Sequence, residues 1–218
     1  NCHRRKPQFV FYQDYTRLFC FQTDPNKILS IFVRHRTINN EGTNVLEGGF
    51  SEVAQHIWNM ELNGIDDIIK ELNDKLLKSD DSIKANFSAL SKEGGLKGPK
   101  KWTLVYLLSE IYSYEYDDFA ENNLYPKVFD QDNYKLVHIN SDDSLGDYKG
   151  YIGNWTILEK QLATGTEDDM TKLMNALNQS ELNANHKLSD SLQAGEWGSD
   201  QIRERQDNFA NNVVTQLW

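Results

Sequence analysis

Apolar residues recur at intervals of three and four in the first half of the chain, which is the spacing of one face of an α-helix. The clearest run follows Gly64 and consists of Ile65, Ile68, Ile69, Leu72, Leu76 and Leu77. It predicts a helix over 65–77. Similar spacing predicts helices over 79–90 and 102–116, the second of them largely buried, with a Gly- and Pro-containing break at 94–99 between them.

A further helix is predicted between Ser51 and Gly64, since serine often caps a first helical turn and glycine often ends a helix. Its apolar face would consist of Ala54, Ile57, Trp58 and Leu62. The preceding segment, 38–50, is rich in Asn and Gly and is predicted to be an exposed loop. Residues 8–21 and 28–33 are apolar clusters whose periodicity does not distinguish helix from strand.

The character of the chain changes at Pro126, which disfavours helix at the residue before it. Two short strands are predicted over 134–139 and 151–158, joined by a polar turn region that contains Gly146. Three helices follow them, over about 168–178, 182–193 and 199–217. The predicted fold is therefore mainly α with a small ββα unit.

We place a domain boundary near residue 125. Residues 1–125 are then a mostly helical support region with a basic N-terminal segment, and residues 126–218 are a second domain that contains the ββα unit. The helical region is expected to pack on that domain.

Composition favours a cytosolic protein. The chain of 218 residues is 39% hydrophobic and 26% charged, as is ordinary for a globular protein. No apolar stretch has the length of a signal peptide or a membrane span, and the start at Asn1 suggests a piece of a longer polypeptide. Cys2 and Cys20 form no metal-binding pattern, so they are expected to be ordinary thiols.

The net charge of -10 argues against a nucleic-acid partner, but the charges are unevenly distributed. Residues 1–40 carry seven Lys and Arg against two acidic residues, a net of +5. Residues 134–218 carry seven against thirteen, a net of -6. Arg34 and Arg36 in the basic segment are therefore candidates for binding DNA phosphates, although a solvated segment has the same composition.

The ββα unit contains residues suited to phosphodiester hydrolysis. That reaction needs a base to activate water and a cation to neutralise charge that develops on the phosphate. His138 ends the first predicted strand, where it could serve as the base, and Asn154 lies in the second. Asn154 could equally tie the loop by hydrogen bonds to the backbone and so orient His138.

The last 85 or so residues resemble the C-terminal HNH-type nuclease domain of GmrSD-type modification-dependent restriction enzymes and of related phosphorothioate-sensing bacterial defence nucleases. The matching residues begin with a His-Ile pair, continue through an Ile-Gly-Asn strand and end in an Ile-x-x-Arg helix that closes on Trp. They are His138, Ile139, Ile152, Gly153, Asn154, Thr156, Leu158, Leu162, Lys172, Trp197, Ile202, Arg205 and Trp218.

This resemblance implies an HNH-type DNA endonuclease or nickase from a bacterial anti-phage restriction protein, located in the cytoplasm. It implies Mg²⁺ or another divalent cation as cofactor and double-stranded, modified or phage DNA as substrate. His138 would be the general base and Asn154 a supporting residue, and Lys172 and Arg205 would contact DNA unless they pair with acids on helix surfaces. A nucleotide-dependent sensor domain of the same protein would be a further partner.

Two metal-ligand positions depart from the family pattern. Val137 stands where the family has an acidic residue, and Ala163 stands where it has a metal-binding Asn. Three explanations remain open: an introduced inactivating substitution at position 163, a naturally degenerate domain, or a metal held instead by Asp142 or Asp143. The alternative functions are accordingly a degenerate HNH-fold module that binds DNA or transmits a signal, and a helical interaction domain without nucleic acid.

Overall fold

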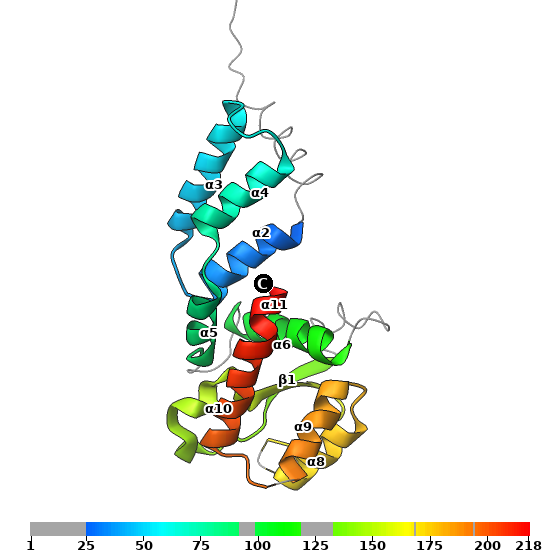
Figure 1. The fold of residues 1–218 in the computed structure, drawn as a ribbon. Coiled ribbons are helices and arrows are strands. Elements are labelled where there is room, and N and C mark those ends of the chain that lie inside the picture. Colours follow the sequence, from blue (N-terminus) through cyan, green and yellow to red (C-terminus); the bar gives the residue numbers. More distant parts are fainter. Residues whose placement is uncertain (1–24, 92–98, 119–132, 168, 194) are drawn as a thin grey trace, which may run out of the picture. The chain divides into compact units, whose positions relative to one another are not determined.

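The structure is a computed structural model that describes residues 25–91, 99–118, 133–167, 169–193 and 195–218 (Figure 1). Within these ranges the chain has nine α-helices and one two-stranded antiparallel hairpin that is followed by helices, as the sequence predicted. The chain forms two compact units, Asn1–Ser79 with Trp218, and Asp80–Leu217. Three features predicted from the sequence lie outside the described residues: the aromatic segment 8–21, residues 94–98 of the predicted break, and the proposed boundary near 125.

The first unit is helical throughout its described part. Helix α2 spans Pro25–Phe32 and continues as the π-helical segment η1, Val33–Ile38; α3 spans Thr43–Trp58 and α4 spans Ile65–Leu76. The undecided apolar cluster at 28–33 is thus helical. The core of this unit consists of Ile31, Leu46, Val53, Leu72 and Leu76.

Helix α3 begins eight residues earlier than predicted, so the expectation of a loop over 38–50 was wrong for residues 43–50, and also for Ile38, which ends η1. Gly48 and Gly49 lie inside the helix. A Cβ atom at Gly49 would come within 2.3 Å of the Leu76 side chain, so this glycine allows α3 and α4 to approach closely. Ser51, the predicted cap, is exposed in the middle of the helix, because the N-cap residue is Gly42.

The second unit begins with two helices that the sequence predicted. Helix α5 spans Asp80–Ser88 and α6 spans Pro99–Tyr116. Helix α6 is largely buried, as expected, and four of its apolar residues have no exposed surface: Leu104, Leu107, Leu108 and Ile111. Although the sequence suggested that α6 belongs to the N-terminal region, its contacts place it in the same compact unit as the hairpin.

The hairpin consists of β1, Tyr134–His138, and β2, Trp155–Glu159. The strands are antiparallel, with Tyr134 opposite Glu159 and His138 opposite Trp155. The second strand is shorter than predicted, because the residues before it form the 3-10 turn η3, Ile152–Asn154. The polar turn region is the 3-10 segment η2, Asp143–Gly150, which is kinked at Gly146 with φ 53°.

Three helices follow the hairpin as predicted: α8 spans Met170–Gln179, α9 spans Asn183–Gln193 and α10 spans Ser199–Asn208. Helix α10 continues through the π-helical segment η4, Phe209–Val214, into α11, Thr215–Leu217. Helices α8 and α9 lie side by side (Figure 1). Both α6 and α9 contact β2, every residue of which is buried.

Helix α10 passes directly over the turn η3. A Cβ atom at Gly153 would come within 2.2 Å of the carbonyl oxygen of Ile202, so only glycine fits at this position without moving the helix backbone. The side chain of Gln206 accepts a hydrogen bond from the Gly153 N–H at 3.1 Å. The Ile-Gly-Asn sequence therefore positions the last long helix against the start of β2.

Candidate functional site

His138 ends β1, as predicted, and its side chain is half-buried. Its imidazole stacks on the indole of Trp155, the residue directly opposite on β2, with ring centroids 3.4 Å apart. Burial, followed by the positive charge of Lys149, lowers the pKa of His138 to about 4, and a hydrogen bond with the Lys149 backbone acts in the opposite direction. The imidazole is therefore neutral near pH 7.

Asn154 has no exposed surface, and its side-chain amide is fully occupied by the backbone. Its Nδ2 donates to the carbonyl oxygens of Asn140, at 2.8 Å, and Lys149, at 3.1 Å. Its Oδ1 accepts from the Asn140 N–H at 3.0 Å. Asn154 thus fastens both ends of the loop that follows His138, which is the supporting role considered from the sequence.

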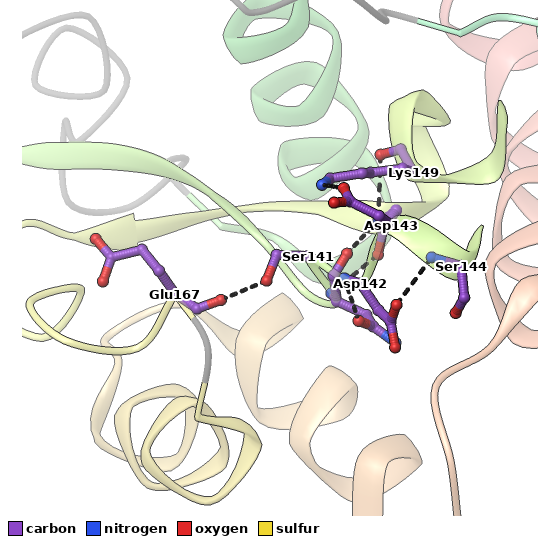
Figure 2. Close-up of polar contacts among 8 residues, drawn as sticks. Ser141, Asp142, Asp143, Ser144, Lys149 and Glu167 are labelled. Carbon is purple, nitrogen blue, oxygen red and sulfur yellow. Dashed lines mark hydrogen bonds and ion pairs between the residues drawn. The ribbon is translucent and has the colours of Figure 1, made fainter. Parts of the chain in front are cut away.

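The two loop carboxylates proposed as metal ligands have different partners (Figure 2). Asp142 accepts a hydrogen bond from the Ser144 N–H at 2.8 Å and so caps η2. This hydrogen bond is the largest of the causes that lower the pKa of Asp142. Asp143 forms an ion pair with Lys149, Nζ to Oδ1 2.5 Å, and its side chain is 96% exposed. Each carboxylate is therefore engaged in holding the loop.

The two departures from the family pattern lie in the apolar core. Val137 is 6% exposed and Ala163 is fully buried, and both belong to one hydrophobic cluster with Leu158, Leu173 and Trp197. No oxygen or nitrogen ligand is available from either side chain. Among the residues that the structure describes, no three His, Cys, Asp or Glu side chains gather closely enough to hold a metal ion.

The residues around His138 therefore do not fit the divalent ion that the family resemblance implies. Such an ion needs several oxygen ligands at about 2.0–2.6 Å. The Asn154 amide oxygen is occupied by a backbone N–H, Asp142 caps a turn, and Asp143 is paired with a lysine. The chemistry that this arrangement offers is a neutral imidazole beside one ammonium group.

The two cations proposed as DNA contacts in this unit have partners within the protein. Lys172 is exposed and pairs with Asp169 at 3.2 Å, one turn earlier on α8. Arg205 donates through Nη1 to the carbonyl oxygens of Gly153, at 3.0 Å, and Trp155, at 2.8 Å. Lys172 thus remains open to solvent, whereas Arg205 fastens α10 to the start of β2.

The two arginines proposed in the basic segment lie in the first unit and differ in exposure. Arg34 is 5% exposed and donates to the carbonyl oxygens of Trp218, at 2.5 Å, and Lys78, at 2.7 Å. Its guanidinium group is thus turned inward and does not form a phosphate-binding surface. Arg36 is exposed and donates to the Glu41 carbonyl oxygen at 3.1 Å.

Sequence reasoning did not identify a buried polar network behind the hairpin. Arg205 Nη2 donates to the Tyr112 hydroxyl at 2.9 Å, which in turn shares a hydrogen bond with Thr156 at 2.9 Å. The Thr156 hydroxyl donates to Asn185 Oδ1 at 2.6 Å, and Asn185 Nδ2 donates to the Ile157 carbonyl oxygen. Two of its members, Thr156 and Arg205, are among the residues that carry the family resemblance, but their spacing in the sequence does not show that they share a network.

No protein-family model matches the chain, and a search of curated proteins gave no match. The resemblance to the GmrSD-type nuclease domain therefore depends on the quoted residues and their spacing. In the part of the chain that is described, no helix is both long enough and apolar enough to span a membrane.

Proposed function

We propose that this chain is part of a bacterial anti-phage restriction or defence protein, and that its HNH-type unit is catalytically degenerate and transmits a signal within the parent protein. The observation that carries the proposal is that the apolar core occupies the two positions where the family has metal ligands. Val137 and Ala163 lie in one apolar cluster, 6% and 0% exposed, where an added ligand would have to displace well-packed neighbours.

The hydrogen bonds around His138 support the same proposal. The Asn154 side chain is consumed by three backbone contacts, and the Lys149 ammonium pairs with Asp143. These contacts stabilise the loop without an ion. A hairpin held in this way keeps its shape and can pass a displacement from one helix to another.

The distribution of charge favours signal transmission over DNA binding. Residues 134–218 carry a net charge of -6, and DNA phosphates require clustered cations. Several of the lysines in this region are paired with acids, as in Lys135 with Glu167 and Lys172 with Asp169. Binding to modified or phage DNA would then belong to another part of the protein, and a nucleotide-dependent sensor domain would be the source of the signal.

A second candidate is the DNA endonuclease or nickase implied by the family, with His138 as general base. The neutral state of the imidazole near pH 7 favours it, because a base must be unprotonated to accept a proton. A pKa of about 4 makes His138 a weak base, however, and the ligand set does not fit Mg²⁺. This candidate therefore ranks below the degenerate module.

Plasmid nicking with Mg²⁺ or Mn²⁺ separates the two candidates. We expect the native chain to leave supercoiled plasmid intact, and His138→Ala to behave identically. Nicking by the native chain that His138→Ala abolishes would overturn the proposal in favour of the nuclease. The variant Ala163→Asn provides a further arm, since nicking that appears only in this variant would indicate that loss of one ligand silenced an HNH site.

Retention of labelled duplex DNA over a range of salt concentrations tests the competing binding role. Under the proposal, retention is weak at all salt concentrations. Tight retention that falls steeply with salt would instead assign a DNA-binding role, because counterion release produces such a slope. The exposed variant Arg36→Gln is a matched test, because only a DNA-binding chain would lose affinity through this change.

A further inference from the structure

A cavity of about 450 Å³ lies on the second unit between the end of α6, α9 and α10. Its lining combines apolar surface from Leu188 and Trp197 with the charged side chains of Lys187, Glu204 and Arg205. Volumes of roughly 300–1,000 Å³ with a largely apolar lining and a few polar groups are typical of small-molecule sites. Of the residues to which the family resemblance gives a role, only Arg205 lines this cavity.

The charged side chains that line the cavity carry a net positive charge of one, from two cations and one anion. The Lys187 ammonium forms no ion pair with any residue that the structure describes. This distinguishes it from Lys135, Lys149 and Lys172, which pair with carboxylates. Lys187 is therefore a lining cation that is not engaged in an ion pair with the described residues.

Arg205, which also lines the cavity, has donors that its contacts within the protein do not use. Its Nη1 donates to the carbonyl oxygens of Gly153 and Trp155, and its Nη2 donates to the Tyr112 hydroxyl. Of the five guanidinium N–H groups, the Nε–H and one Nη2–H then have no partner among the described residues. Stacking of the guanidinium on Phe209, at 5.0 Å from the ring centroid, fixes its orientation.

The indole of Trp197 also lines the cavity. The Trp197 side chain is 6% exposed, and its Nε1–H is buried without a hydrogen-bond partner in the described structure. The Nε1–H of Trp155 is also buried without a partner, and neither atom reaches the surface, so Trp197 offers the cavity apolar surface rather than a donor.

We propose that this cavity binds a small monoanionic carboxylate with an apolar body. The carboxylate receives hydrogen bonds from Arg205 and charge compensation from Lys187, and the apolar body lies on Trp197 and Leu188. A single negative charge matches the lining better than a doubly charged phosphate does. The proposal is independent of whether the hairpin cleaves DNA.

The occupant would be coupled to the hairpin through Arg205 and Trp197. Arg205 holds the Trp155 carbonyl, and Trp155 stacks on His138. The Trp197 carbonyl oxygen accepts a hydrogen bond from Asn140 Nδ2 at 2.8 Å, and Asn140 begins the loop after His138. A ligand that reorients Arg205 or Trp197 therefore moves both sides of the His138 loop.

The test is an NMR titration of the whole chain with sodium benzoate as the probe, following the indole N–H signals, which are assigned with Trp197→Phe. We expect a saturable shift of the Trp197 signal with a dissociation constant on the order of millimolar, given nine heavy atoms. A smaller shift of the Trp155 signal should follow the same curve. Benzamide, of the same shape but neutral, should bind at least about tenfold more weakly.

Variants at the rim provide the control for charge. Lys187→Gln should weaken benzoate binding by about 3- to 10-fold, and Lys187→Arg should restore it. Arg203→Gln removes a 68% exposed cation from α10 outside the cavity and should leave the affinity unchanged. Because Lys187 is exposed, its replacement leaves the folded core intact.

Three outcomes would overturn the proposal: no saturable shift of the Trp197 signal, equal affinity for benzoate and benzamide, or equal losses in Lys187→Gln and Arg203→Gln. Phenyl phosphate and inorganic phosphate separate the possible head groups. Tighter binding of either than of benzoate would assign the cavity to phosphates and refute the carboxylate assignment. A failure here leaves the nicking result, and hence the proposed function, unaffected.

Discussion

Replacing Gln206 by Met should destabilise the second unit solely through the loss of hydrogen bonds. Gln206 has no exposed surface, and its Oε1 accepts from the Gly153 N–H at 3.1 Å. Its Nε2 lies within 3.0 Å of the carbonyl oxygens of Phe87, Ser88 and Leu90, at the end of α5. Met has nearly the same length and volume, so the change removes polar contacts without creating a large cavity.

The expected loss can be counted group by group. The Gly153 N–H is left buried without a partner, which costs about 1–3 kcal/mol. The Phe87 carbonyl keeps a hydrogen bond from the Leu90 N–H, and the Ser88 and Leu90 residues are only partly buried, so these carbonyls add about 1 kcal/mol or less. The total, roughly 1–4 kcal/mol, is a large part of the 5–15 kcal/mol typical of a folded domain.

Urea unfolding followed by far-ultraviolet circular dichroism measures this loss as a lower transition midpoint at unchanged slope. The matched control is Gln201→Met, because Gln201 is exposed on the same helix and accepts only from the Gly198 N–H. Hydrogen exchange at the Gly153 amide should accelerate in Gln206→Met only. Equal stability of the two variants, within about 0.5 kcal/mol, would refute the assignment of Gln206 as the link between α5 and α10.

Three further predictions concern backbone space and protonation. Gly153→Ala, whose new methyl would meet the α10 backbone at 2.2 Å, should destabilise by about 1–3 kcal/mol in thermal unfolding, whereas Gly195→Ala, with open space around it, should change little. Gly48→Ala should stabilise α3 by up to about 1 kcal/mol, and Gly49→Ala should not, because its methyl would meet a leucine of α4. His138 should titrate at a pKa of about 4 by NMR. Because the unfolded chain takes up the proton at a higher pH than the folded chain does, the free energy of unfolding should fall as the pH drops from 6.5 to 4. We expect a fall of roughly 1–2 kcal/mol, since solvent around this half-buried imidazole reduces the effect. An NMR pKa near 6.5 would contradict the burial of this imidazole against its neighbouring indole.

The helices were predictable wherever one face is apolar and the other is charged. The run from Ile65 to Leu76 became α4 because its spacing buries Leu72 and Leu76 in the core. The start of α3 was missed for a physical reason. Gly48 and Gly49 have low helix propensity, and their presence reflects close packing against another helix, which a local pattern cannot reveal.

The candidate site was predictable only in its local parts. The position of His138 at a strand end follows from the alternation of the strand, and the loop-tying role of Asn154 follows from its residue type. The partners of Gln206 lie up to 119 residues away in sequence. The stacking of His138 on Trp155 depends on the register of the hairpin, which sequence spacing alone does not determine.

The hairpin and the helix beside it are held together by hydrogen bonds that do not involve a metal ion. In a metal-stabilised unit, losing a ligand costs folding free energy, because binding and folding are coupled. Here Asn154 fastens the loop, while Arg205 and Gln206 fasten α10 to the turn before β2, each through contacts with the backbone. Val137 and Ala163 add apolar packing on the same side. A unit held by these contacts folds without metal ligands, which is the physical condition that the proposed catalytically degenerate unit requires.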